Sequence, residues 1–148
     1  MNILVDACVV SILFNNSNEK HSDFVPILER IKDGRVKMVF GGTHFNKELS
    51  KLYRYLKIIK QLKTAGRAIK LNDADVDAQE ARIRKIEPLP DFDDPHLIAI
   101  VIVSKASVVC TVDSRAMPFI RQPRFYAKTG VTRPSIYQRS DDHLHLLP

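Results

Sequence analysis

The sequence predicts an α/β fold, a three-layer sandwich in which a short, mostly parallel β-sheet lies between helices. Three short runs rich in Val and Ile occupy residues 3–5, 36–40 and 108–112. Strands that are apolar along their whole length are typical of parallel sheets covered on both faces. Segments with helical spacing of apolar residues separate the three runs, and this alternation indicates crossover connections between parallel strands.

Helices are expected on both sides of the second strand. Before it, an amphipathic stripe begins after Ser22, a candidate N-cap, and stops at Gly34. After it, Thr43 is expected to cap a helix, because apolar residues recur at helical spacing from His44 to about Ile69. Lys and Arg fill the remaining positions, which predicts one long basic helix, or two divided near its glycine. Such a face is either solvated or in contact with phosphates.

The second half of the chain contains two further helices and a possible edge strand. Asn72 is the expected cap of a helix that ends near Lys85. Asp94 followed by Pro95 marks another helix start, and the apolar run that follows indicates a buried helix. A last strand is expected within residues 131–137, at the edge of the sheet because the segment contains a proline.

The composition fits a single globular domain spanning residues 1–148, with 45% hydrophobic residues and no low-complexity tract. The apolar runs are shorter than the roughly 20 residues that a membrane span requires. The N-terminus has neither a basic region nor a cleavage site. We therefore expect a cytoplasmic protein with no membrane contact. Cys8 and Cys110 lie in apolar runs and are expected to be buried thiols rather than a disulfide or a zinc site.

The charge balance is basic, with a formal net charge of +6 and a pI near 9.4. Lys and Arg that contact phosphates release condensed counterions, so a nucleic acid is a plausible partner. Many basic proteins bind no nucleic acid, and the charge is informative only together with a site that has the matching chemistry.

Four acidic residues occupy positions where this fold would bring them together. Asp6 and Asp113 follow the first and third predicted strands, Glu48 lies in the helix after the second, and Asp94 begins the buried helix. In parallel sheets, ligands bind beyond the carboxyl ends of the strands. Each residue has an alternative interpretation: Asp94 as a helix cap, Glu48 as a partner of Lys51, and the other two as turn residues. The functional interpretation depends on all four converging.

Converging carboxylates require a counter-charge. Two of them about 4 Å apart repel by roughly 4 kcal/mol at an effective dielectric constant of 20. A hard divalent cation such as Mg²⁺ or Mn²⁺ binds carboxylate oxygens and waters, and it also binds substrate phosphates. Such an ion activates water for attack on a phosphodiester.

Four sequence blocks, in this order along nearly the whole chain, resemble the PIN-domain family of small metal-dependent nucleases, which includes VapC-like toxins. The blocks are Ile3–Asp6, Lys47–Leu49, Asp93–Ala99 and Thr111–Asp113. The resemblance implies a PIN-like parallel sheet and endonucleolytic cleavage of RNA. It implies that Mg²⁺ or Mn²⁺ is held by the catalytic residues Asp6, Glu48, Asp94 and Asp113, with Thr111 as a supporting hydroxyl. It also implies a toxin role, an antitoxin protein as partner, and a homodimer.

Two positions depart from the family pattern. Ala7 and Cys8 follow Asp6, where many relatives have a hydroxyl or amide residue, and Ser114 follows Asp113, where some have another acid. The alternative function is a catalytically inactive PIN-fold module that binds RNA or another protein. A phosphoacceptor receiver domain is disfavoured, since Asp6 has no acidic neighbour and no Lys ends a late strand.

Overall fold

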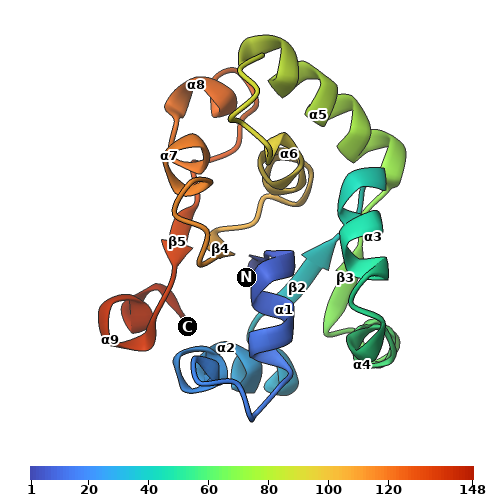
Figure 1. Ribbon diagram of the computed structural model, residues 1–148, viewed down its shortest axis with the longest axis vertical. Coiled ribbons are helices and arrows are strands. Elements are labelled where there is room, and N and C mark those ends of the chain that lie inside the picture. The colour runs from blue at the N-terminus through green and yellow to red at the C-terminus, as the bar shows by residue number, and fades with distance from the viewer.

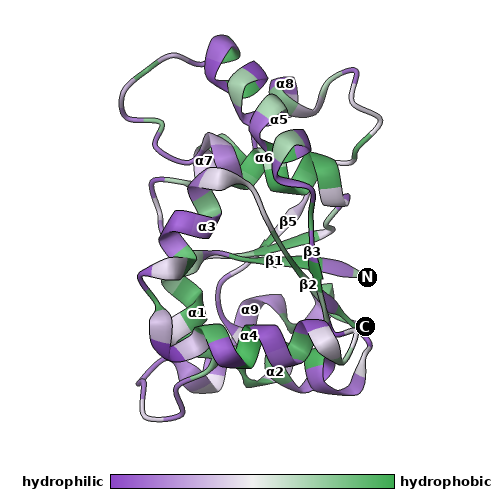
Figure 2. Cartoon of the chain, turned by 90° about the vertical axis from the view of Figure 1, so that its right-hand side faces the viewer, coloured by the Kyte–Doolittle hydropathy of each residue, from purple (hydrophilic) through white to green (hydrophobic).

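The computed structural model describes residues 1–148 and contains one five-stranded sheet in which all four strand pairs are parallel. The strands, in spatial order, are β3 (Ala68–Lys70), β2 (Lys37–Phe40), β1 (Asn2–Val5), β4 (Val108–Cys110) and β5 (Ser135–Tyr137). Helices cover both faces of this sheet, as Figure 2 shows. The predicted α/β three-layer fold is therefore confirmed.

The strand order reverses between β1, the central strand, and its neighbour β4. In their register, Leu4 pairs with Val39 on one side and with Val109 on the other. The chain leaves β1 toward one side and β4 toward the other, so the carboxyl ends of these two strands border the crevice in which doubly wound α/β proteins bind ligands. Asp6 and Asp113 follow these two strands.

Two helical layers enclose the sheet. The first layer contains α1 (Ala7–Leu13), α2 (His21–Asp33), α4 (Tyr53–Thr64) and α9 (Ser140–His143). The second contains α5 (Asp73–Ile86), α6 (Pro95–Ser104), α7 (Met117–Ile120) and α8 (Pro123–Tyr126). Figure 2 shows the two layers above and below the strands. Helix α3 (Thr43–Ser50) contacts α1 and α4 as well as α5 and α6, and it therefore joins the layers. A 3₁₀ turn, Leu144–Leu146, follows α9.

Helix α6 is the buried helix that the sequence predicts. Nine of its ten residues are buried, and it packs chiefly against α5 and also against β1 and β2. It lies in the middle of the molecule, between α5 and α7 (Figure 1). The buried apolar side chains of the chain form one contiguous core. No helix combines the length and the apolar character that crossing a membrane requires.

The basic segment after α3 differs from its prediction. The chain leaves helical geometry at Leu52 (φ −99°, ψ 48°), so α3 and α4 are separate helices, and α4 ends at Thr64. Gly66, at φ 75°, then turns the chain into β3, which pairs with β2. The break between the two helices therefore lies earlier in the chain than expected. The sequence does not predict β3, because a strand of three residues shows almost no alternation of apolar and polar residues.

Several ends of elements also differ from expectation. Helix α2 begins at His21 with Lys20 at its N-cap, so Ser22 does not cap it, whereas the stop at Gly34 is confirmed by a left-handed C-cap with φ 85°. The N-cap of α3 is Gly42 (φ 88°) rather than Thr43. A Cβ on Gly42 would lie 2.5 Å from a methyl carbon of Val76, so both the backbone angle and the space favour glycine.

The strand predictions at the C-terminal end of the chain were too long. β4 stops at Cys110, two residues before the end of the apolar run, and β5 begins only after Pro134. The edge position of β5 is confirmed by the strand order. The shortening of β4 places Thr111 and Asp113 beyond the sheet, in the loop at its carboxyl edge.

Candidate metal centre at the carboxyl edge of the sheet

Asp6 directly follows β1 and occupies the N-cap position of α1, yet its carboxylate does not cap the helix. Its backbone carbonyl accepts the Val9 N–H at 2.8 Å. The side chain is 6% exposed, and its Oδ2 accepts hydrogen bonds from Thr111 Oγ1 at 2.8 Å and from Cys8 Sγ at 3.4 Å. Burial raises the pKa of Asp6 and the charge of Glu48 adds to this, while the bonds from Thr111 and Cys8 oppose it.

Thr111 connects two of the predicted acids. It is fully buried, and the oxygen that donates to Asp6 also accepts the backbone N–H of Asp113 at 3.1 Å. A single hydroxyl thus fixes the Asp6 carboxylate and the loop that carries Asp113. Thr111 is therefore positioned to support both acidic residues, and its role at the site stays a prediction.

The two cysteines differ, and the expectation that both are buried is wrong for Cys8. Cys110 is buried in β4, whereas Cys8 is exposed on α1. The Cys8 sulfur nevertheless lies against Asp6, and it is 3.8 Å from Thr111 Oγ1. Loss of water around the sulfur, together with the Asp6 charge, raises the pKa of Cys8 to about 12. The thiol therefore acts as a neutral hydrogen-bond donor to Asp6 at neutral pH.

One side-chain oxygen of Asp113 stabilises a turn, and the other has no protein partner. Its Oδ1 accepts the N–H of Arg115 at 3.0 Å, which is the turn role that the sequence left open. No protein group donates a hydrogen bond to its Oδ2. Asp113 therefore retains one oxygen for a ligand.

Asp94 occupies the N-cap of α6, again without a capping bond from its side chain. Burial raises the pKa of Asp94 to about 6, and the charges of Asp6, Asp113 and Glu48 contribute to this rise while His96 opposes it. The charges of all three other acids thus affect the pKa of Asp94. By contrast, Asp91 and Asp93 are exposed.

Glu48 approaches the same region from α3, and its contacts are with histidines. Its Oε1 lies 2.5 Å from Nε2 of His96, at an angle too poor for a hydrogen bond, and 3.8 Å from Nε2 of His44, which is too far for one. Partial burial raises the pKa of Glu48, but the contact with His96 and the positive charges of His44 and Lys51 outweigh burial and lower it overall. No protein group donates a hydrogen bond to its Oε2.

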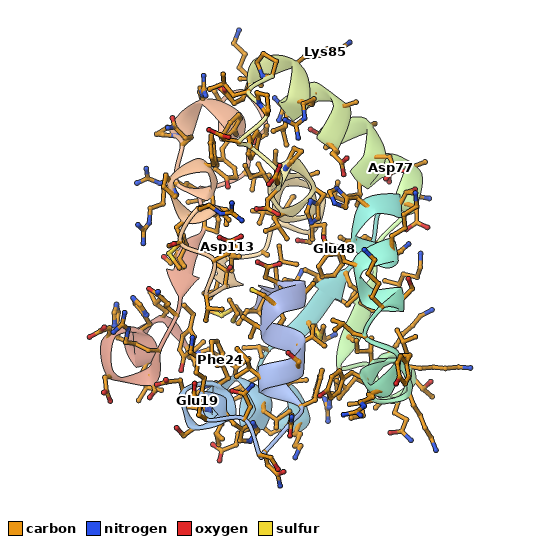
Figure 3. The ribbon with its side chains drawn as sticks, in the orientation of Figure 1. Glu19, Phe24, Glu48, Asp77, Lys85 and Asp113 are labelled. Atoms are coloured by element: carbon orange, nitrogen blue, oxygen red, sulfur yellow. The ribbon has the colours of Figure 1, made fainter.

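The four acids thus come from four separate segments to one edge of the sheet, but they do not form a closed cage. Figure 3 shows Glu48 and Asp113 on either side of the middle of the molecule, at the level between α1 and α6. No three of the four carboxylates bring ligand atoms within 4.8 Å of one another. An arrangement of this openness fits Mg²⁺ or Mn²⁺, because such ions keep several waters and need only one or two direct carboxylate ligands.

One group of side chains at the site was not predicted. Ligand atoms of His44, Glu80 and His96, from α3, α5 and α6, all lie within 4.8 Å of one another. The sequence does place His44 one helical turn before Glu48 and His96 two residues after Asp94. It could not place Glu80, which comes from a third helix, α5.

The two histidines are packed together. Their ring centroids lie 3.7 Å apart. His96 is 1% exposed, whereas His44 is 41% exposed at its side chain. Burial and the neighbouring His96 lower the pKa of His44.

Comparison with known proteins does not identify a family for this chain. The chain matches neither a protein-family model nor a curated protein sequence.

Proposed function

We propose that the protein is a Mg²⁺- or Mn²⁺-dependent endoribonuclease that hydrolyses RNA phosphodiester bonds at the carboxyl edge of its sheet. One observation carries the proposal: four carboxylates from four segments gather where the strand order reverses. Two of them, Asp6 and Asp94, stand at helix N-caps without capping. Carboxylates that share one edge of the sheet, affect one another's pKa and do not cap the helices on which they stand are best explained by a bound cation.

The roles of the side chains follow from their free oxygens. Asp6, held by Thr111, and Asp94 and Asp113 would hold the ion. Glu48 directs one oxygen at the histidines, which leaves Oε2 to bind the ion or to accept a hydrogen bond from the attacking water. The ion supplies Lewis-acid activation of water and stabilises charge on the phosphodiester oxygens.

The surface around the acids favours a polyanionic substrate. Lys51 is exposed and close enough to lower the pKa of Glu48, and Arg115 is exposed two residues after Asp113. With a net charge of +6, the chain would attract RNA. A bound metal ion would offset the repulsion between the carboxylates and the RNA phosphates. The toxin role, the antitoxin partner, the homodimer and the cytoplasmic location stay predictions from the resemblance and the sequence.

The test is a matched pair of neighbouring substitutions. Asp94→Asn is expected to abolish cleavage of a single-stranded RNA in Mg²⁺ or Mn²⁺, whereas Asp93→Asn, one residue earlier and exposed, keeps it. Both variants should have native circular dichroism. Wild-type protein that is folded but cuts no RNA with either metal would contradict the proposal, as would equal activity of the two variants.

A binding module without catalysis is the second candidate, and a groove beside α4 favours it. This cavity of about 370 Å³ lies outside the acidic site; its walls include Leu56 and Ile59, and its rim carries Lys60, Lys63 and Lys70. A binding module would show salt-sensitive RNA affinity that survives loss of Asp94 but is reduced when Lys60 and Lys63 are replaced. Affinity of that kind without any cleavage by wild type favours this candidate.

A further inference from the structure

His96 is a buried histidine whose two ring nitrogens have no well-aligned hydrogen-bond partner. Buried polar atoms are nearly always satisfied, and leaving one without a partner costs about 1–3 kcal/mol. The nearest acceptor to its Nε2 is Glu48 Oε1, at 2.5 Å, and that oxygen also lacks an aligned donor. The Nδ1 atom has no protein partner at all. A ligand outside the protein chain is the simplest way to satisfy it.

The surroundings of His96 supply the other components of a metal site. His44 stacks on it, with Nδ1 of His44 3.8 Å from Glu80 Oε1 and Nε2 of His44 3.8 Å from Glu48 Oε1. Glu48 therefore lies beside the Nε2 atoms of both rings. This leaves the Nδ1 atoms of both rings available as ligand atoms, and the Nδ1 of His44 lies beside Glu80.

We infer that His44, His96 and Glu80 bind a borderline transition ion of the Zn²⁺ class, at a site separate from the hard-ion site of the aspartates. Both histidines bind through Nδ1 and Glu80 through Oε1. Glu48, whose Oε1 lies beside the Nε2 atoms of both rings, is the outer carboxylate and would accept their Nε2–H groups once a bound ion orients the rings. The inference goes beyond the nuclease proposal and does not depend on it.

The donor set selects the ion. Two imidazoles suit Zn²⁺, Ni²⁺, Co²⁺ and Cu²⁺, whereas Mg²⁺ prefers oxygen ligands only. Ligand atoms about 2.0–2.1 Å from a tetrahedral Zn²⁺ lie about 3.4 Å from one another. The separation of 3.8 Å between His44 and Glu80 requires a shift of only a few tenths of an ångström to reach that value.

Glu48 has the role that carboxylates commonly have behind metal-bound histidines. A ligating imidazole usually donates its second N–H to a carboxylate, which fixes the tautomer and raises the basicity of the ligand. Here the same carboxylate has its other oxygen free for the acidic site. Binding of a transition ion would therefore hold Glu48 in the orientation in which Oε2 is available to that site.

Metal binding by the intact chain tests the inference. After removal of metals with a chelator, the protein is titrated with Zn²⁺ by calorimetry in an excess of Mg²⁺, which occupies the oxygen-only site. Wild type is expected to bind one Zn²⁺ and to melt at a higher temperature. His44→Gln should weaken Zn²⁺ binding at least tenfold, and Glu48→Gln about tenfold to a hundredfold, as for other residues behind metal ligands. Because His44 is partly exposed, its replacement should leave the fold intact.

Three variants separate this site from other donors in the chain. Asp113→Asn alters only the aspartate site and should keep Zn²⁺ binding even if it abolishes RNA cleavage. Cys8→Ser removes the exposed thiol beside Asp6, and His145→Gln removes an exposed histidine near the C-terminus. Both are expected to bind Zn²⁺ as wild type does. The inference is overturned if wild type binds no Zn²⁺, if His44→Gln binds it unchanged, or if Cys8→Ser or His145→Gln removes the binding.

Discussion

Helices α5 and α6 both begin at a residue suited to capping, yet only α5 uses it. Asn72 is extended (ψ 121°), and its side chain accepts the N–H of Asp75 at 3.1 Å. Asp94 has ψ 38° and makes no side-chain cap, while its backbone carbonyl accepts the N–H of Leu97 at 3.1 Å. At α6 a backbone carbonyl thus accepts a first-turn N–H group, as the Asn72 side chain does at α5. The Asp94 carboxylate makes no such bond and is free to face the other acids.

Asp6, after β1, likewise serves its helix with its backbone and not with its side chain. Asp6 is at the N-cap of α1, its backbone carbonyl accepts two N–H groups of the helix, and its carboxylate bonds to Thr111 and Cys8 instead. Placing charged oxygens together in this way costs stability, because burial and repulsion raise the pKa of both aspartates. Asn72 is an ordinary helix cap, whereas the side chains of Asp6 and Asp94 make no capping bond and lie at the candidate metal centre.

The largest difference between the two kinds of N-cap should be in activity. Asp6→Asn is expected to reduce RNA cleavage by about a hundredfold or more, since it removes a charge that holds the ion. Its melting temperature without metal should not fall, because the lost charge is one that burial disfavours. Asn72→Ala, measured in the same cleavage assay, should have wild-type activity. Equal losses in the two variants would mean that the aspartates act as ordinary caps.

The support of Asp6 should matter less than Asp6 itself. Thr111→Val keeps the shape of the side chain but removes the hydroxyl that donates to Asp6 and accepts from Asp113. We expect the concentration of Mg²⁺ or Mn²⁺ needed for half-maximal cleavage to rise about tenfold to a hundredfold, with a smaller effect at saturating metal. A metal titration of the cleavage rate measures both. An unchanged dependence of the cleavage rate on metal concentration would mean that Thr111 does not support metal binding.

The crowding of carboxylates should also appear in stability against pH. The pKa of Asp94 is about 6 in the folded protein, above its ordinary value of 3.8. The folded protein therefore holds this proton more tightly than the unfolded chain, and the free energy of unfolding falls as the pH rises from about 4 to about 6 and stays lower above that. Because the group is partly exposed, screening reduces the effect to about 1 kcal/mol.

Thermal unfolding without metal measures this effect. Between pH 4 and pH 7 the melting temperature of wild type should fall about 2–4 °C more than that of Asp94→Asn. Addition of Mg²⁺ at pH 7 should restore the loss in wild type and not in the variant. If the melting temperatures of the two proteins depend on pH in the same way, the pKa of Asp94 is not raised in the folded protein.

The sequence predicts the strand-end acids well and the histidine site poorly, for a physical reason. Asp6 and Asp113 are placed by local signals, since each follows a β-branched run, and parallel strands align their carboxyl ends. The contact between His44, Glu80 and His96 depends instead on how α3, α5 and α6 pack. That packing rests on features such as Gly42 against Val76, and no periodicity in the chain encodes it.

The break after α3 shows the same limit. The apolar spacing from residue 44 to residue 69 is helical throughout, and the chain still leaves the helix at Leu52 and forms a strand at Ala68. Pairing of β3 with β2 supplies backbone hydrogen bonds that outweigh local propensity. Tertiary contacts of this kind are invisible in a single sequence.

The smallest expected effect is on the ordinary cap. Asn72→Ala removes the side-chain acceptor for the Asp75 N–H and should lower the free energy of unfolding by about 1 kcal/mol. The matched change at α6, Asp94→Ala, should cost less, because its side chain makes no capping bond and its charge is unfavourable where it lies. Chemical denaturation of the two variants at pH 7 without metal compares them directly. A larger loss at Asp94 than at Asn72 would mean that the Asp94 carboxylate stabilises α6, and the distinction between a cap and a ligand would fail.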